Sequence, residues 1–117
     1  KQGQVLKVII ECGLFSLGRI AIATTCVRRL GCAFVKTSTG VLAGGADPAH
    51  VALMSALCAK SATKVKASGG IRDIVTAQQM IRLGAVRLGT SSGIAIVSDP
   101  QPRTTNSPSI PKSDGMY

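Results

Sequence analysis

Short apolar runs alternate along the chain with longer segments in which apolar residues recur at helical spacing. Four of these runs predict buried strands, at residues 6–10, 33–36, 64–67 and 86–88. Three amphipathic segments lie between the strands, and the apolar residues 94–97 are expected to begin a last helix. The chain therefore alternates strand and helix in units of roughly 20 to 30 residues.

Each of the three helices between the strands carries start signals. Ser16 and Asp73 can accept hydrogen bonds from free backbone N–H groups, and Asp47 is followed by a proline that fits the first helical turn. Gly31 and Gly84 mark the ends of the first and third helices. The predicted inward stripes are Leu17, Ile20, Thr24, Val27 and Leu30, then Val51, Met54 and Leu57, then Ile74, Ala77, Met80 and Ile81.

This alternation predicts an α/β fold with about four parallel strands, because strand–helix–strand units return each strand in the same direction through a right-handed crossover. The organised part is expected at residues 1–98. Four of the five prolines lie in residues 100–117, among Ser, Thr, Asn and Gln. That composition cannot bury apolar surface, so residues 99–117 are predicted to form a disordered tail.

The length of 117 residues allows one ordinary domain and excludes a whole eight-stranded α/β barrel, which needs about 250. The net charge of +9 favours an anionic partner. Nucleic acid ranks last among such partners, because the cations are spread along the chain and aromatic residues are scarce. The lack of an apolar run of about 18 residues argues against a membrane-spanning helix.

The four cysteines show no C-x-x-C spacing and stand in apolar segments. With a single histidine in the chain, they do not form a zinc pattern, and we expect buried free thiols. Free thiols favour a reducing, cytoplasmic location.

The candidate chemistry lies where the predicted strands end. Lys36 closes the second strand and Lys66 the third, while glycine- and serine-rich turns follow the third and fourth. Because bare backbone N–H groups and a helix N-terminus both favour an anion, Gly69-Gly70 could bind a phosphate, and Gly89 with Ser91 and Ser92 could complete the site. Ordinary tight turns are the alternative interpretation.

The two lysines allow a more specific hypothesis. A lysine at a buried strand end carries a charge that is costly to desolvate, and a second lysine beside it raises that cost. One amine then loses its proton and can add to a carbonyl as a Schiff base. The alternative is that Lys36 and Lys66 both point into solvent, although apolar Phe34, Val35 and Val65 precede them.

Three separated motifs resemble those of the deoxyribose-phosphate aldolase family: Phe34-Val35-Lys36-Thr37-Ser38-Thr39-Gly40, Val65-Lys66-Ala67-Ser68-Gly69-Gly70-Ile71-Arg72 and Leu88-Gly89-Thr90-Ser91-Ser92-Gly93. The likeness covers roughly residues 5–98. It implies a class I aldolase on a TIM (β/α)₈ barrel, without metal or other cofactor, that interconverts 2-deoxyribose 5-phosphate with acetaldehyde and glyceraldehyde 3-phosphate. This places the chain in deoxyribonucleotide and carbohydrate catabolism.

The resemblance also implies roles for single residues. Lys36 matches the lysine that forms the Schiff base, and Lys66 matches the second lysine, which takes part in proton transfer. The matches to the phosphate contacts of the sugar phosphate are Gly40, Gly69, Gly70, Arg72, Gly89, Ser91 and Ser92.

The chain also departs from the family pattern. The family's essential aspartate lies in an upstream strand without a counterpart here, so the chain resembles the C-terminal half of a barrel. Lys64 shares strand parity with Lys66 and would point into the barrel, where the family often has glycine. A half barrel leaves edge strands and the inner sheet face uncovered, so we expect self-association or a missing N-terminal half. We also expect little aldolase turnover from these 117 residues alone, and the alternative is a non-catalytic half barrel that binds sugar phosphates.

Overall fold

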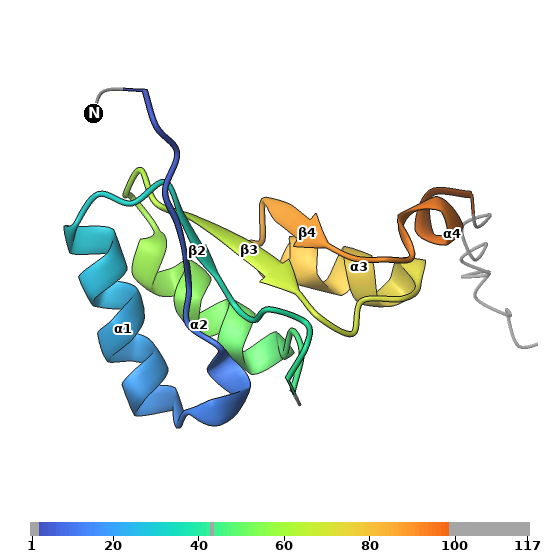
Figure 1. Ribbon diagram of the computed structural model, residues 1–117, viewed down its shortest axis with the longest axis horizontal. Coiled ribbons are helices and arrows are strands. Elements are labelled where there is room, and N and C mark those ends of the chain that lie inside the picture. Colours follow the sequence, from blue (N-terminus) through green and yellow to red (C-terminus); the bar gives the residue numbers. More distant parts are fainter. Residues whose placement is uncertain (1–2, 43, 99–117) are drawn as a thin grey trace, which may run out of the picture.

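A computed structural model describes residues 3–42 and 44–98 of the chain. Four strands form one parallel sheet in sequence order: β1 (Lys7–Ile9), β2 (Phe34–Lys36), β3 (Lys64–Ser68) and β4 (Arg87–Gly89). The helices are α1 (Leu17–Arg29), α2 (Pro48–Cys58), α3 (Ile74–Arg82) and α4 (Gly93–Ser98), and a short 3-10 helix η1 (Cys12–Leu14) follows β1 (Figure 1). The parallel α/β architecture predicted by the alternating pattern is confirmed. The predicted tail at 99–117 lies outside the described residues.

The predicted start signals are present in the structure. The Asp47 carboxylate accepts hydrogen bonds from the N–H groups of Ala49 at 2.8 Å and of His50 at 3.3 Å. Asp73 accepts from the Thr76 N–H at 2.8 Å, and Ser16 accepts from the Arg19 N–H at 3.5 Å. Gly31 and Gly84 follow α1 and α3 with positive φ angles of 67° and 106°. These ends were predictable because capping depends on neighbours in the sequence.

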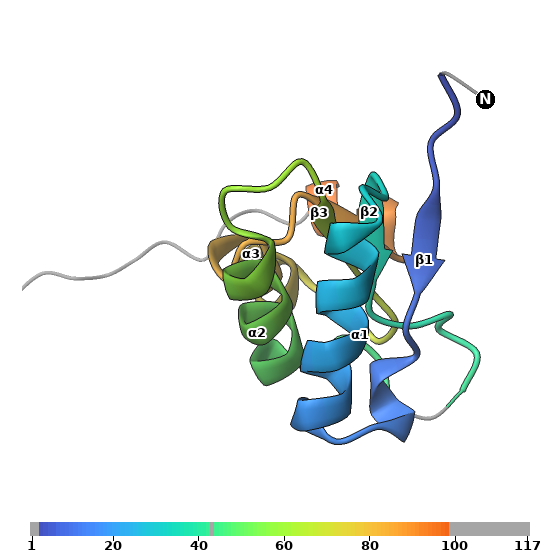
Figure 2. The same cartoon turned by 90° about the vertical axis from the view of Figure 1, so that its left-hand side faces the viewer.

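Helices α1, α2 and α3 lie on one face of the sheet, and the core fills the space between (Figure 2). Its fully buried members include Val35 from β2, Ile20 from α1, and Met54 and Met80 from α2 and α3. The residues predicted to point inward are buried near the middle of the helices and exposed near their ends. Leu17, Leu30 and Ile81, predicted to point inward, have 50%, 79% and 56% of their surface exposed.

These residues near the helix ends are exposed because each helix packs only its central turns against four short strands. On α3 the buried positions are Ala77 and Met80, and Ile81 is rotated about 100° further around the axis, away from the sheet. The prediction of four buried thiols is also wrong at one position. Cys12, Cys32 and Cys58 are buried, but Cys26 is exposed on α1.

The other face of the sheet has no helix over it among the described residues (Figures 1 and 2). Neighbouring strands pair Lys7 with Phe34 and Phe34 with Lys64, and one level higher they pair Ile9 with Lys36 and Lys36 with Lys66. Lys66 in turn pairs with Arg87 on β4. Residues in register share a face, so these side chains form one surface, which we call the open face. Its members are Lys7, Ile9, Phe34, Lys36, Lys64, Lys66, Ser68, Arg87 and Gly89.

Within residues 3–42 and 44–98, every helix is too short or too polar to cross a membrane. This finding agrees with the absence of a long apolar run in the sequence.

Candidate active site

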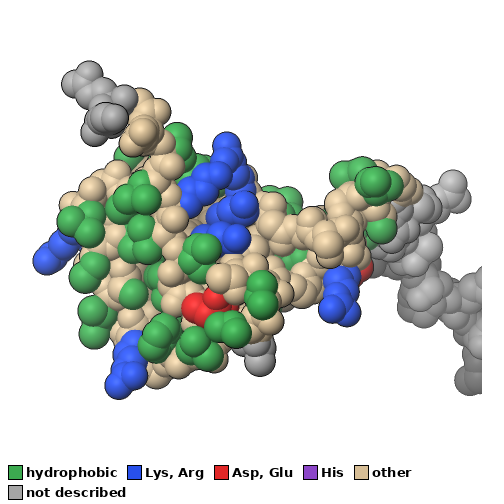
Figure 3. Space-filling view, viewed as in Figure 1, with side chains coloured by type: hydrophobic (Ala, Val, Ile, Leu, Met, Phe, Trp, Pro, Cys, Tyr) green, Lys and Arg blue, Asp and Glu red, His purple; other side chains and the backbone are tan. Residues whose placement is uncertain are grey.

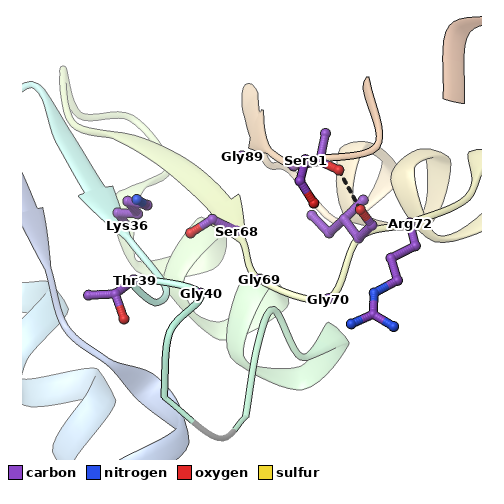
Figure 4. Close-up of a pocket in the computed structure, with 11 residues that line it drawn as sticks. Lys36, Thr39, Gly40, Ser68, Gly69, Gly70, Arg72, Gly89 and Ser91 are labelled. Carbon is purple, nitrogen blue, oxygen red and sulfur yellow. Dashed lines mark hydrogen bonds between the residues drawn. The ribbon is translucent and has the colours of Figure 1, made fainter. Parts of the chain in front are cut away.

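A cavity of about 290 Å³ lies at the carboxyl ends of β2, β3 and β4 (Figure 4). Three loops meet there, because the strands are parallel and their carboxyl ends share one edge of the sheet. Three lining residues, Lys36, Ser68 and Gly89, end β2, β3 and β4. The others follow these strands: Thr39 and Gly40 after β2, Gly69 to Arg72 after β3, and Thr90 and Ser91 after β4. The cavity is therefore built from the three segments that carry the aldolase-like motifs.

The two candidate lysines are lateral neighbours. Lys36 is the last residue of β2 and pairs in register with Lys66 on β3. Lys66 is not the end of its strand, as the sequence had suggested, because β3 continues to Ser68. Both lysines are half-buried, although they lie on the open face of the sheet.

Positive charge surrounds Lys66. Desolvation lowers the pKa of the Lys66 ammonium below its ordinary value, and the charges of Lys36, Lys7 and Arg87 lower that pKa further. The expected effect of two adjacent lysines is thus present, and it acts on Lys66. A lowered pKa raises the fraction of neutral amine at a given pH, and such an amine can accept a proton from a neighbouring group.

The ends of β2 and β3 are joined by buried hydroxyl groups. The Thr37 Oγ1 donates to the Ser68 carbonyl at 3.1 Å and accepts from the Ser68 N–H at 3.0 Å. The Ser68 Oγ donates to the Ser38 carbonyl at 2.6 Å, and the Ser38 Oγ donates to the Ser68 carbonyl. This reciprocal set holds the loop after Lys36 against the loop that contains Gly69.

A second set of contacts connects β1 to the same loop. The Glu11 carboxylate accepts from the Thr39 N–H at 3.1 and 3.3 Å, and Glu11 itself has a left-handed backbone with φ 58°. The Cys12 N–H donates to the Thr37 carbonyl at 2.8 Å. The loop after Lys36 is therefore held from both neighbouring strands.

Glycine is required where the loops approach one another. Gly69 has φ +91°, and a Cβ on it would lie 2.9 Å from both the Gly45 Cα and the Ser38 Oγ. A Cβ on Gly89 would lie 2.8 Å from the Ser68 Cβ and 3.3 Å from the Lys66 Cε. Side chains at these positions would displace the residues that surround the cavity.

The structure brings most of the predicted site residues to the cavity. Lys36, Gly40, Gly69, Gly70, Arg72, Gly89 and Ser91 line it, whereas Lys66 and Ser92 do not. Lys66 stands beside Lys36 on the open face, and Ser92 precedes α4 and donates its N–H to the Thr90 Oγ1 at 2.9 Å. The guanidinium of Arg72 extends away from Lys36 (Figure 4).

Four lining residues were missed by sequence reasoning: Thr39, Ser68, Ile71 and Thr90. Thr90 links two of the loops, because its Oγ1 donates to the Ile71 carbonyl at 2.5 Å. Thr39 comes directly before Gly40, and Thr90 directly after Gly89, both in polar segments. Their position next to a predicted site glycine was the sequence signal that could have identified them. Ser68 gave a weaker signal, because it was interpreted as part of a turn.

Within the part of the chain that the structure describes, no group of three or more His, Cys, Asp or Glu side chains is arranged to hold a metal ion. The candidate chemistry is carried by amines, hydroxyls and backbone amides.

Comparison with known proteins identifies relatives of this chain. The chain is 48% identical over 97 residues to a deoxyribose-phosphate aldolase from each of two strains of Histophilus somni, and the match covers 83% of the chain and 43% of each relative. The chain thus spans less than half the length of the curated relatives it matches. No family model matches the chain.

Solved structures show the same relationship. A crystal structure described as a deoxyribose-phosphate aldolase from Coccidioides immitis matches with TM-score 0.76 and 45% identity, over 80% of this chain and 38% of that one. The tetrameric deoxyribose phosphate aldolase from Aeropyrum pernix matches with TM-score 0.73 and 39% identity, over 81% of this chain and 41% of that one. The fold is therefore part of an aldolase barrel, as the motifs had indicated.

Proposed function

Because the chain belongs to the deoxyribose-phosphate aldolase family, we propose that its cavity serves the reversible cleavage of 2-deoxy-D-ribose 5-phosphate. The products are acetaldehyde and D-glyceraldehyde 3-phosphate. The chain spans 43% of the length of the Histophilus somni relative that it matches. The observation that carries the proposal is the in-register pair of Lys36 and Lys66 beside a cavity flanked by glycine-rich loops.

Lys36 is the proposed nucleophile. Its neutral amine adds to the substrate aldehyde, and loss of water gives an imine that acts as an electron sink. A base then removes the proton from the C3 hydroxyl, the bond between C2 and C3 breaks, and its electrons pass into an enamine on Lys36. Protonation of the enamine at carbon and hydrolysis release acetaldehyde and restore the amine.

Lys66 is proposed to move protons for Lys36. Its lowered pKa raises the fraction of neutral amine beside Lys36, and such an amine can accept a proton there. Proton transfer between lateral neighbours on β2 and β3 needs no rearrangement of the backbone.

The glycine-rich turns are proposed to hold the phosphate. Gly69 and Gly70 line the cavity shortly before the start of α3, where an anion is favoured, and Gly89 lines it from the end of β4. Gly40 and Ser91 lie at the same cavity, and exposed Arg72 adds positive charge at its margin. Ser92, which precedes α4, remains a weaker member of this set.

Borohydride trapping tests the nucleophile. The 117-residue chain, incubated with acetaldehyde and borohydride, is expected to gain an N-ethyl group at Lys36, which peptide mass mapping locates. The exposed Lys60 is the internal control and should remain unmodified, because it lies outside the cavity at the strand ends. Equal modification of Lys36 and Lys60 would contradict the proposal.

The second candidate is a sugar-phosphate-binding half barrel without turnover. It is favoured by the chain's span of less than half the length of its curated relatives. We expect little cleavage of deoxyribose 5-phosphate by the chain alone in a coupled assay. Binding of deoxyribose 5-phosphate that survives in Lys36→Ala, with no trapped imine in the unmodified chain, would identify this second function.

A further inference from the structure

Glu11 differs from the other carboxylates in the described residues. Asp47 and Asp73 accept hydrogen bonds from the first N–H groups of their own helices, whereas Glu11 accepts from a loop 28 positions further along the chain. In the view of Figure 3, acidic side chains are far fewer than Lys and Arg side chains. Glu11 is thus a scarce type of side chain that serves a contact between distant segments.

The backbone of Glu11 is also uncommon. Its φ of 58° lies in the left-handed region, which residues other than glycine, asparagine and aspartate rarely adopt. Glycine would adopt this conformation without strain. Backbone strain of this kind clusters at active sites and ligand-binding loops, so the contacts of the Glu11 side chain indicate what the strained position supports.

The end of β1 is hydrogen-bonded to the end of β2 and to the loop that follows it. The Ile10 N–H donates to the Lys36 carbonyl at 3.0 Å. At Glu11 the left-handed turn then leads the chain from β1 into η1. The Glu11 carboxylate accepts the Thr39 N–H at 3.1 and 3.3 Å. A side-chain acceptor therefore continues the pairing beyond the point where the backbone of β1 turns away.

The loop after β2 is fixed in different ways along its length. Residues 37–38 are fully buried and hydrogen-bonded to the end of β3. Thr39 and Gly40 are exposed, so burial does not fix them, and both line the cavity together with Lys36. The position of this exposed half of the loop therefore depends on its hydrogen bonds. The bond from Thr39 to Glu11 has an ionised acceptor, which makes it stronger than a bond between neutral groups.

A displaced Thr39 would change the site in which Lys36 acts. Figure 4 shows Lys36 and Thr39 on one side of the cavity, across from Gly89. A shift of about 1 Å in groups that position a substrate can lower a rate by about two orders of magnitude. Glu11 is not one of the lining residues, so its influence on the cavity passes through Thr39.

We propose that Glu11 is a positioning residue for imine formation at Lys36, and that its carboxylate holds the exposed half of the loop after β2 at the cavity through the Thr39 N–H. This role rests on the proposed function, because the position of the loop matters for catalysis only where Lys36 reacts with the substrate. Glycine would satisfy the backbone at this position, so the side chain accounts for the presence of glutamate.

The first test separates the side chain of Glu11 from its backbone. Glu11→Gly removes the carboxylate but also relieves the left-handed strain, so the 117-residue chain should lose little stability in a urea titration. The rate of borohydride trapping of acetaldehyde at Lys36 should nevertheless fall on the order of tenfold. A matched control is Lys60→Gly, because Lys60 has the same left-handed backbone, with φ 60°, but lies outside the cavity. The control should trap at the unmodified rate, and a Glu11→Gly chain that also does so would overturn the proposal.

Conservative variants test whether the hydrogen bond carries the effect. Glu11→Gln keeps an oxygen acceptor at the same reach and should recover most of the lost trapping rate. Glu11→Asp is one methylene shorter and should trap as slowly as Glu11→Gly. A Glu11→Gln chain as slow as Glu11→Gly would contradict a role through the Thr39 N–H.

Amide hydrogen exchange followed by NMR distinguishes this role from the proposed function. The Thr39 N–H should exchange faster in Glu11→Gly than in the unmodified chain and in Lys60→Gly, and this readout needs no chemistry at Lys36. A complete lack of trapped imine in the unmodified chain would contradict the proposed function. Normal trapping together with unchanged exchange at Thr39 in Glu11→Gly would instead overturn the role of Glu11.

Discussion

The two faces of the sheet differ sharply although they are built from the same four strands. The face under the helices presents Val35, Val65 and Ala67, all buried and packed against apolar side chains of α1, α2 and α3. The open face presents Lys7, Phe34, Lys64 and Arg87 together with Lys36 and Lys66. Strand alternation separates the two sets, and among the described residues helices cover only one of them.

The two faces of the sheet therefore contribute differently to the stability of the fold. The covered face is stabilised by burial of apolar surface, which does not depend on pH or salt in the range where lysines stay charged. The open face gains little from burial of apolar surface, because its cations Lys7, Lys64 and Arg87 are exposed. The following predictions test that division, from the largest expected effect to the smallest.

The first prediction compares adjacent positions on opposite faces of β3. Val65→Asp should abolish cooperative unfolding, because it places an unpaired carboxylate in the core where Val65 is 2% exposed. Lys64→Asp should change the free energy of unfolding by no more than about 1 kcal/mol, because its side chain is exposed. Thermal unfolding followed by circular dichroism measures both. A Lys64→Asp protein as damaged as Val65→Asp would show that the faces do not differ in this way.

The second prediction concerns packing under the helices. Met54→Ala should lower the free energy of unfolding by about 2–5 kcal/mol, since Met54 is fully buried and its removal leaves a cavity. Ile22→Ala on the outer surface of α1 is the matched control, with an expected change within about 0.5 kcal/mol. Urea titration gives both values, and similar losses at the two positions would argue against a core centred on α2.

The third prediction uses the pKa of Lys66. Because this pKa is lower in the folded chain than in the unfolded one, the unfolded state binds more protons between the two values. Below the folded-state pKa of Lys66, the full free-energy cost of burying its charge opposes folding. The free energy of unfolding should therefore rise as the pH increases from that value toward 10.5.

The Lys66→Met variant isolates this effect. It should be more stable than the unmodified chain at neutral pH, and its advantage should shrink as the pH is raised. Lys60→Met removes an exposed lysine outside the sheet and is the control for the loss of one positive charge. Urea titrations of all three proteins at several pH values test the sign, and an advantage that grows with pH would refute the assignment.

The fourth prediction distinguishes thiols by exposure. Cys26 should react rapidly with an aromatic disulfide reagent, because it lies on the exposed surface of α1. Cys12 should react far more slowly, since burial raises the pKa of its thiol to about 11 and little thiolate forms at neutral pH. Stopped-flow absorbance of the native chain measures the phases. Loss of the fast phase in Cys26→Ser is expected, and its persistence would place the reactive thiol elsewhere.

Local signals explain why much of the fold was predictable. Asp47 and Asp73 bond to N–H groups two or three residues away, so the starts of α2 and α3 needed no tertiary information. The stripe from Ile20 to Val27 follows from helical periodicity alone. Ile81 and Cys26 were misplaced because periodicity indicates an apolar direction but not how wide a surface the neighbouring elements will cover.

The candidate site was predictable to the extent that its residues stand in motifs. Lys36, Gly69 and Gly89 end or follow strands, and parallel strands bring their carboxyl ends to one edge. The sequence offered no indication that Glu11 reaches the Thr39 N–H, or that Thr37 and Ser68 exchange hydrogen bonds. These contacts join residues about thirty positions apart, and their formation depends on strand register.

The sequence by itself determined the order of strands and helices, the ends of the helices and the residue types available for imine chemistry, because each depends on short-range spacing. Only the tertiary structure decided that Lys36 and Lys66 are lateral neighbours, that Lys66 has the lowered pKa, and that Lys7 and Arg87 converge on Phe34. Register between strands sets these relations, and it places separate segments at one level on one face.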